Sequence, residues 1–250
     1  MSRIFNNCLD CVKEMDRELK VCGLSVPVKH YQNVVLEKED QMTKELIGVS
    51  FIISKPLSKR RDMIEFLFPD EVENIEQYCK QEIKDRVSGK ALNPGNSYKI
   101  RFDLWQKFMS KGTNEEKFDY TYSERISAYN QIQAVVGSLK EDIHSRRAML
   151  MIWDSSIDSS RMEGANTRIP CSISYQFLIR NNRLFCIYYI RSNDYYAHWA
   201  LDIWLSGALM EYIRKQLLDP YPNLKLGSLN YFCGSFHVYN HDLKKRNVVF

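Results

Sequence analysis

The segment from Ile169 to Trp204 constrains the fold of this chain more than any other part of the sequence. It contains two runs rich in β-branched and aromatic residues, Tyr175–Ile179 and Leu184–Ile190, with Asn181 and Asn182 between them. Such runs are typical of β-strands, and asparagine is one of the residues that tight turns favour. The sequence therefore predicts two neighbouring strands joined by a short turn.

A cluster of polar side chains follows directly after the second run. It consists of Arg191, Ser192, Asn193, Asp194, His198 and Asp202. A buried core needs none of this polarity, because charged residues are almost never fully buried without a partner. The end of the second strand is therefore a candidate functional site. Cys171 stands at the start of the first strand, but a free cysteine is often simply buried, so Cys171 alone decides nothing.

The remaining predicted elements do not alternate regularly between helix and strand. Apolar residues at helical spacing predict helices over 1–30, 70–86, 101–109, 126–139 and 201–217. Further β-rich runs predict strands over 34–36, 45–54, 148–153 and 230–239. The first two of these strands read as a hairpin-like unit, with Lys38 in its turn. This order favours an α+β fold in which helices pack against a large mixed sheet.

The composition is that of a globular protein. Hydrophobic residues make up 44% of the 250 residues and aromatic residues 12%, enough for a sizeable core. We expect one domain over 1–250, with 1–30 as an N-terminal helical segment. The sequence has no run of 18 apolar residues, and its N-terminus is too polar for a signal peptide. Seven scattered cysteines fit reduced thiols, so we expect a soluble, cytoplasmic protein with no membrane partner.

Charge and metal-ligand patterns narrow the ligand classes. The net charge of +4, without a basic stripe, suits a small anionic ligand and does not predict nucleic-acid binding. Cys8 and Cys11 form a C-x-x-C pair without a second ligand pair at zinc spacing. They are therefore interpreted as helix-face thiols, and no metal is predicted. Arg146 and Arg147 are adjacent; such arginines are usually solvated, yet each guanidinium can bind a phosphate through two hydrogen bonds.

Five short motifs resemble the thymidylate synthase family in their order and spacing. They are Ser145-Arg146-Arg147, Pro170-Cys171, Tyr175-Gln176-Phe177, Arg191-Ser192-x-Asp194 and Gly234-Ser-Phe-His237-Val-Tyr239. The resemblance covers roughly residues 38 to 239. It implies a thymidylate synthase-like fold in which one sheet face forms the interface of a homodimer. It also implies that the substrate is a pyrimidine nucleoside monophosphate.

The resemblance implies a role for each matching residue. Cys171 matches the family nucleophile, whose thiolate adds to C6 of the pyrimidine. The matches to phosphate ligands are Lys38, Arg191 and Ser192 from the same subunit, and Arg146 and Arg147 donated by the neighbouring subunit. The matches to other nucleotide ligands are His237 and Tyr239 at the sugar 3′-hydroxyl, and Asp194 and Gln176, which order the nucleotide and its waters. Glu82 matches the glutamate that manages proton transfers through water.

An aspartate stands at the base-recognition position. Eleven residues after the phosphate-binding arginine, thymidylate synthases have an asparagine, and this chain has Asp202. A carboxylate accepts a hydrogen bond from N4 of cytosine and, when protonated, also donates to N3. As an anion it cannot donate to O4 of uracil. The same replacement occurs in the bacteriophage deoxycytidylate hydroxymethylases, which this chain also resembles in Gly48-Val-Ser-Phe51 and Gln176-Phe-Leu-Ile-Arg180.

The resemblance thus predicts a hydroxymethyltransferase that acts on C5 of dCMP or CMP with methylenetetrahydrofolate. Its course would be a covalent bond between Cys171 and C6, followed by capture of an exocyclic methylene by water. Two alternatives stay open: a divergent thymidylate synthase that methylates dUMP, and a non-catalytic nucleotide-binding protein on the same scaffold. Because only eleven residues follow Tyr239, we expect Asn247-Val-Val-Phe250 to form a shortened lid over the folate. His198 replaces a family glycine and is interpreted as a structural residue at a helix entry.

Overall fold

The structure is a computed structural model that describes residues 3–31, 34–36, 41–110, 116–163 and 167–245. Lys38 and the expected lid at 247–250 lie outside the described residues. Their predicted roles stay predictions.

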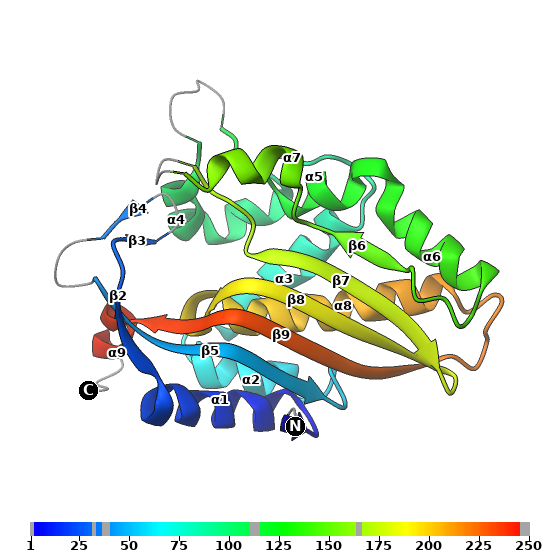
Figure 1. Cartoon of the computed structure of the whole chain (residues 1–250), viewed down its shortest axis with the longest axis horizontal. Coiled ribbons are helices and arrows are strands. Elements are labelled where there is room, and N and C mark those ends of the chain that lie inside the picture. The colour runs from blue at the N-terminus through cyan, green and yellow to red at the C-terminus, as the bar shows by residue number, and fades with distance from the viewer. Residues whose placement is uncertain (1–2, 32–33, 37–40, 111–115, 164–166, 246–250) are drawn as a thin grey trace.

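A mixed sheet of seven strands forms the centre of the described fold (Figure 1). Its strands are β1 (Arg3–Phe5), β2 (Leu24–Pro27), β5 (Met42–Ile53), β6 (Met149–Met151), β7 (Ser172–Arg180), β8 (Arg183–Asp194) and β9 (Lys225–Tyr239). The order is β1-β5-β9-β8-β7-β6, and β2 pairs with β5. β1 is parallel to β5 and β8 to β9, whereas the other neighbours are antiparallel. The predicted α+β fold with a large mixed sheet is confirmed.

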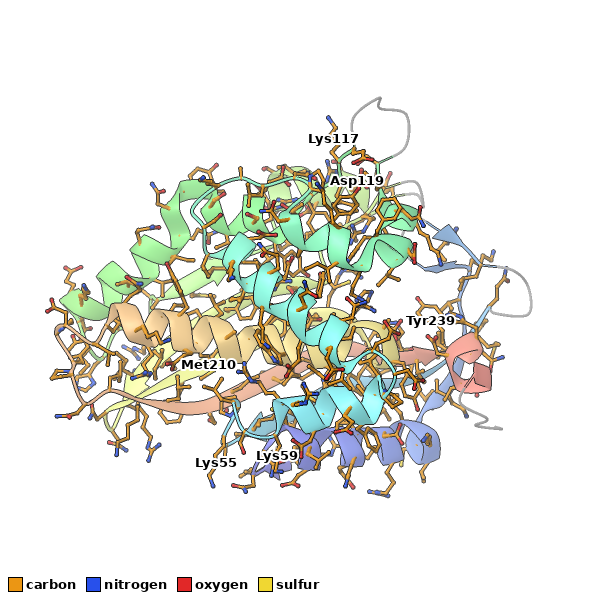
Figure 2. The ribbon with its side chains drawn as sticks, turned by 180° about the vertical axis from the view of Figure 1, so that it is seen from behind. Lys55, Lys59, Lys117, Asp119, Met210 and Tyr239 are labelled. Carbon is orange, nitrogen blue, oxygen red and sulfur yellow. The ribbon has the colours of Figure 1, made fainter. Side chains whose placement is uncertain are left out.

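Helices cover one face of this sheet. They are α1 (Cys8–Cys22), α2 (Arg60–Leu67), α3 (Val72–Arg86), α4 (Phe102–Trp105), α5 (Tyr122–Ser127), α6 (Gln131–Glu141), α7 (Ser155–Asp158), α8 (Ala200–Gln216) and α9 (Asn240–Lys245). Seen from behind in Figure 2, α8, α3 and α2 lie across the sheet. None of the described helices is both long and apolar enough to cross a bilayer.

Helix α8 is the central helix of the core. It packs against β8 and β9 on one side and against α2 and α3 on the other. This explains why residues such as Ile203, Leu209 and Ile213 are fully or almost fully buried around much of its circumference. The predicted helix over 201–217 is therefore confirmed, and its first turn is held firmly against the ends of the strands.

The N-terminal prediction was partly wrong. Only Cys8–Cys22 is helical; Arg3–Phe5 and Leu24–Pro27 are strands that pair with β5. Ile4, expected on the helix, lies in β1. The sheet edge overrides local helix preference here, because each added strand satisfies backbone groups that β5 would leave unpaired. Cys8 and Cys11 are fully buried in the core, as expected of helix-face thiols, and the Cys8 Sγ donates to the carbonyl oxygen of Pro56 at 3.4 Å.

Three other elements differ from the prediction. The strand at 34–36 is β4 (Val34–Val35), which pairs with β3 (His30–Tyr31) in a separate ribbon and not with β5. The predicted helix over 126–139 is two helices, because Tyr129 and Asn130 take positive φ values of 57° and 52°. The predicted helix over 101–109 is α4 between two tight 3₁₀ turns, Asn96–Arg101 and Gln106–Phe108. Trp105 and Phe108 of this segment pack in one aromatic cluster, whereas Phe102 is 42% exposed.

The face of the sheet opposite α8 carries apolar side chains. Tyr189 and Phe232 stack there with ring centroids 5.4 Å apart, and they are 36% and 40% exposed. Met149 and Met151 on β6 are each 41% exposed, and Ile47 on β5 is 73% exposed. Figure 1 shows this face toward the viewer, with the helices behind it. An apolar sheet face of this kind is typical of an interaction surface.

Candidate active site

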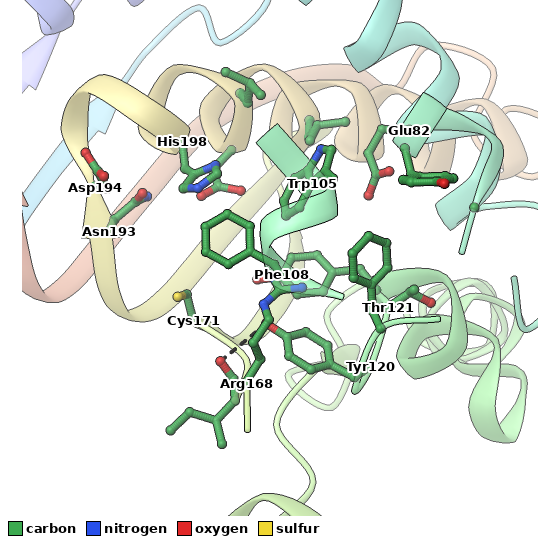
Figure 3. Close-up of a pocket in the computed structure, with 18 of the residues that line it drawn as sticks. Glu82, Trp105, Phe108, Tyr120, Thr121, Arg168, Cys171, Asn193, Asp194 and His198 are labelled. Carbon is green, nitrogen blue, oxygen red and sulfur yellow. Dashed lines mark hydrogen bonds between the residues drawn. The ribbon is translucent and has the colours of Figure 1, made fainter. Parts of the chain in front are cut away.

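A cavity of about 590 Å³ lies between the ends of β8 and β9, helix α3 and the start of α8. Eight of the predicted site residues line it: Glu82, Cys171, Arg191, Ser192, Asp194, Asp202, His237 and Tyr239. They come from five separate parts of the chain. The structure therefore brings together most of the residues that the sequence singled out, and Figure 3 shows part of this cavity.

Parallel pairing of β8 with β9 places two of the motifs side by side. Asp194 is opposite His237, and Ser192 is opposite Ser235. The Nδ1 of His237 lies 3.2 Å from the Ser235 hydroxyl. Residues that pair across two strands lie side by side. This register therefore brings the Arg191-Ser192-x-Asp194 and His237-Val-Tyr239 motifs to the same end of the cavity.

Cys171 stands immediately before β7 and is held against Arg191. The Arg191 backbone N–H donates to the Cys171 carbonyl at 2.9 Å, and its Nε donates to the carbonyl oxygen of Pro170 at 2.8 Å. The Arg191 Nη2 lies 3.8 Å from the Cys171 Sγ. An adjacent guanidinium favours the thiolate over the thiol, and the half-buried sulfur faces the cavity. The arrangement suits a nucleophilic cysteine.

Asp202 lies in the first turn of α8, where the helix dipole favours a carboxylate. Burial nevertheless raises the pKa of Asp202 to about 7, although Arg86 and a hydrogen bond from Asn193 act in the opposite direction. The amide of Asn193 also donates to the Tyr231 hydroxyl at 3.0 Å. Asp202 can thus exist in both protonation states near neutral pH. The sequence placed Asn193 in the polar cluster without a role, and its contacts with Asp202 and Tyr231 supply one.

Glu82 reaches the cavity from α3 and is fixed by two hydrogen bonds. The Arg86 Nε donates to Glu82 Oε1 at 2.7 Å, and the Ser97 hydroxyl donates to Oε2 at 2.5 Å. The guanidinium of Arg86 also lies over the ring of Tyr122, 4.3 Å from its centroid. A carboxylate held in this way keeps a constant orientation toward the cavity, which proton transfer through a water requires.

Asp194 and His237 are two buried polar residues of the site. The Asp194 carboxylate accepts hydrogen bonds from the backbone N–H groups of Tyr196 and Ala197, each at 3.2 Å, and so caps the wide helical turn that precedes α8. Burial, together with the charge of Asp242, raises the pKa of Asp194 to about 8. Burial lowers the pKa of His237 to about 4, so His237 is neutral at pH 7.

Three predicted residues do not line the cavity. Gln176 lies on β7 beside Ile187 of β8, on the sheet face opposite α8, and its amide donates to the Arg146 carbonyl at 3.0 Å. Strand alternation directs the Gln176 side chain away from the cavity of its own chain, and its predicted role in ordering the nucleotide stays a prediction. Arg146 and Arg147 line a separate hollow with Arg180. Their predicted donation to a neighbouring subunit stays a prediction.

An aromatic wall, absent from the predictions, forms the other side of the cavity. It consists of Trp105, Phe108, Phe118 and Tyr120. Arg168 lies among these rings in Figure 3, and His198 is stacked on Trp105 with ring centroids 5.6 Å apart. Burial and the charges of Arg101 and Arg168 lower the pKa of His198 to about 3. The density of aromatic residues over 98–122 was the only available signal, and it did not distinguish core from ligand site.

The fold and this site define a class of protein that holds a cysteine and an arginine together in one polar and aromatic cavity. Residues 70–249 match the family model described as "Thymidylate synthase". The chain therefore belongs to the thymidylate synthase family, whose members are folate-dependent one-carbon transferases that act on nucleotides as dimers.

Individual relatives agree with this assignment. Proteins named "Putative thymidylate synthase" are 29% identical in Methanosarcina mazei, over 57% of this chain and 63% of the relative, and 25% identical in Methanosarcina acetivorans, over 88% and 84%. This chain thus spans slightly less than two thirds of the first relative. The crystal structure of thymidylate synthase from T4 phage has the same fold, with a TM-score of 0.65 and 17% identity over 94% of this chain and 78% of that one. The expected likeness to phage deoxycytidylate hydroxymethylases stays a prediction.

Proposed function

We propose that this protein is a cytosine-nucleotide hydroxymethyltransferase that converts dCMP or CMP to the 5-hydroxymethyl nucleotide. The observation that carries the proposal is Asp202, a half-buried carboxyl group that lines the cavity and is hydrogen-bonded by Asn193. A protonated Asp202 donates to N3 of cytosine and accepts from its N4 amino group, so both polar edges of the base are satisfied. Ionised Asp202 still accepts from N4 of cytosine, but it cannot donate to O4 of uracil.

Phosphate and sugar binding would orient the nucleotide for attack by Cys171. Arg191 and Ser192 supply charge-assisted hydrogen bonds for the 5′-phosphate. His237 and Tyr239 stand at the C-terminal end of β9, beside Ser192 and Asp194, and would contact the 3′-hydroxyl. With these groups bound, the base extends toward Asp202, and its C6 lies nearest to the thiol of Cys171.

The reaction then needs one nucleophile and one route for protons. The Cys171 thiolate bonds to C6, and the electron pair of the C5–C6 double bond moves to C5, which becomes nucleophilic. When bound, methylenetetrahydrofolate supplies a one-carbon unit to C5. Glu82 would receive the C5 proton through a water while the bond from the one-carbon unit to tetrahydrofolate breaks, which leaves an exocyclic methylene on C5. Water then adds to that methylene and gives up a proton, the C5–C6 double bond re-forms, and the C6–S bond breaks to regenerate the thiolate.

The residues present suit a planar folate beside the nucleotide. Ligand cavities typically measure roughly 300–1,000 Å³, and the cavity here measures about 590 Å³. The rings of Trp105 and Phe108 offer a stacking surface on the side of Cys171 away from Asn193 and Asp194 (Figure 3). The indole Nε1 of Trp105 is buried and, among the described residues, has no hydrogen-bond partner. We therefore assign the aromatic wall to the folate.

The decisive experiment compares three nucleotides in two proteins. Tritium release from C5 of labelled dCMP, CMP and dUMP is measured with methylenetetrahydrofolate, for the wild type and for Asp202→Asn. The wild type is expected to release tritium from a cytosine nucleotide, and the variant to shift its preference toward dUMP by roughly 100-fold, as one good bidentate contact allows. Release from dUMP alone by the wild type would refute the proposal.

A thymidylate synthase that methylates dUMP is the second candidate, and the names of the archaeal relatives favour it. It would form dihydrofolate, which absorbs in the near ultraviolet, whereas hydroxymethylation leaves tetrahydrofolate. Recording dihydrofolate during the same assay therefore separates the two reactions. If a nucleotide binds but neither reaction occurs, the non-catalytic alternative replaces both.

We also propose that a homodimer forms through the open sheet face. This face carries Tyr189, Phe232 and Met149, and Arg146 lies at its margin, where it contacts Gln176. Arg146 and Arg147 do not line the cavity of their own chain, which fits their donation to the partner's phosphate site. Sedimentation of wild type and of a Phe232→Glu variant tests the interface, since a charge in an apolar contact should give a monomer.

A further inference from the structure

Arg168 is a buried cation in the wall of the cavity that none of the roles above uses. It stands three residues before Cys171, and only 8% of its surface is exposed. Its guanidinium carbon lies 5.3 to 5.6 Å from the ring centroids of Trp105, Phe108, Phe118 and Tyr120. Aromatic faces attract a cation, and they offer it no hydrogen-bond acceptor of carboxylate strength.

The guanidinium has an unused donor. Its Nε is buried and, within the described residues, makes no hydrogen bond. The described ion pairs also include none with Arg168, although its backbone N–H donates to Asp119 Oδ2 at 2.7 Å and so fixes the position of the residue. A buried charged donor without an acceptor is unfavourable, and a ligand oxygen that met it would be bound strongly.

The position of Arg168 indicates which molecule supplies that oxygen. The groups assigned to the nucleotide are on other elements: Arg191 on β8, Asp202 on α8 and His237 on β9. Arg168 and Trp105 both face the aromatic side, and both carry a buried N–H donor that lacks a partner among the described residues. Two unpaired donors beside a stacking surface fit a flat molecule that carries oxygen acceptors.

We infer that Arg168 is a binding residue for the second substrate, and that its guanidinium donates to a carbonyl or carboxylate oxygen of a planar, folate-type one-carbon donor. This inference rests on the proposed function, because it takes that donor to occupy the aromatic wall. A leucine in the same cage would offer only apolar contact. Arg168 therefore makes binding depend on an oxygen at this point, and it selects among planar molecules that the aromatic rings alone would accept.

The test is calorimetric binding to protein saturated with its nucleotide. The probes are folic acid, p-aminobenzoylglutamate, which carries the benzoyl carbonyl and the carboxylates, and 6-hydroxymethylpterin, which carries the ring carbonyl alone. Loss of one charge-assisted bond should weaken folic acid binding to Arg168→Leu by about 10- to 100-fold, with nucleotide binding changed less than about threefold. The fragment whose affinity also falls in Arg168→Leu contains the oxygen that Arg168 contacts.

Two further variants separate recognition from a structural role. Arg60→Leu is the matched control, because the Arg60 guanidinium also lies over an aromatic ring, 4.3 Å from the centroid of Trp204, but does not line the cavity. It should leave folic acid affinity unchanged. Arg168→Lys keeps the charge but lacks the planar, multiply donating guanidinium. Its affinity for folic acid should therefore lie between those of the wild type and Arg168→Leu. The Tm of Arg168→Leu should stay level or rise, since an apolar side chain then fills an aromatic cage.

The outcomes are distinct. Equal folic acid affinity in wild type and Arg168→Leu, or a lower Tm with unchanged affinity, would overturn the inference and leave the proposed function intact. If nucleotide-saturated wild type fails to bind folic acid and both fragments, the folate-dependent function falls, and the inference falls with it.

Discussion

The polar side of the cavity is built from strand ends and a helix start, whereas its aromatic side is built from short helical turns and loops. Arg191 and His237 lie on paired strands, and Asp202 lies in the first turn of a long buried helix. Trp105 and Phe108 come from α4 and the tight turn after it. Groups on long elements keep their spacing better than groups on short ones. The polar side, which we assign to the nucleotide, is therefore the more rigid, and the side assigned to the folate owes its order to aromatic packing.

The largest effect is expected from removing Cys171, the proposed nucleophile. Cys171→Ala should lower the rate of tritium release by on the order of 10⁴-fold or more, because no other group can activate C5. Nucleotide affinity should stay within a few fold, since the phosphate, sugar and base contacts persist. Tritium release and calorimetry on the same preparation check both. Residual turnover above about one per cent of the wild-type rate would mean that Cys171 is not the nucleophile.

Removing the phosphate contact should affect the polar side alone. Arg191→Ala is expected to weaken nucleotide binding by roughly 10- to 100-fold, the usual effect of losing a charged hydrogen bond. Binding of the unphosphorylated nucleoside should barely change, because Arg191 has no role in it. Arg183→Ala, on the exposed end of β8, is the control. An equal loss for nucleoside and nucleotide would mean that Arg191 supports the Cys171 loop and does not bind the phosphate.

Removing the stacking surface should affect the aromatic side alone. Trp105→Ala is expected to weaken folic acid binding about tenfold, because a ring contact and a buried N–H donor are both lost. Nucleotide affinity should change little. Fluorescence titration with folic acid, and calorimetry with nucleotide, separate the two sides. A comparable fall in nucleotide affinity would show that the two sides are not independent.

The smallest expected effect is the pH dependence that Asp202 contributes to stability. Burial raises its pKa from 3.8 to about 7, so the folded state binds this proton more tightly than the unfolded state does. The stability that this proton contributes is complete below pH 4 and is lost as the pH rises to about 7. The Tm of Asp202→Asn relative to wild type should therefore increase between pH 4 and pH 8. A constant difference would contradict the raised pKa.

The protonation state of Asp202 should also affect the rate of turnover. A protonated Asp202 donates to N3 of cytosine, so the activity on dCMP or CMP should fall as the pH rises above about 7. Asp202→Asn carries no titrating group there and should lack that fall on its preferred nucleotide.

The sequence predicted the sheet and most of the polar side, and it did so for a physical reason. Strand runs such as those in β7 and β8 have a period that can be counted, and Cys171, Arg191 and His237 are chemically unusual in a strand context. The aromatic side escaped prediction because Trp105, Phe108 and Arg168 become neighbours only through tertiary packing. Their residue types are equally common in cores.

Breaks within helices escaped prediction for another reason. The apolar spacing over 126–139 continues unbroken across Tyr129 and Asn130, whereas their positive φ values separate α5 from α6. Gln176 shows what a motif alone does not reveal: strand alternation turns its side chain to the sheet face opposite α8, whereas its neighbours Tyr175 and Phe177 are buried.

The register between β8 and β9 also bears on how such proteins can change over generations. Asp194 is opposite His237 although 43 residues separate them in the chain (237 minus 194). A single inserted residue in either strand would turn one motif away from the other. We therefore expect neither strand to tolerate an insertion between its paired residues. The connection from α8 to β9, residues 217–224, contains none of the predicted site residues. Descendants of this chain should therefore differ in length there while the paired strands keep theirs.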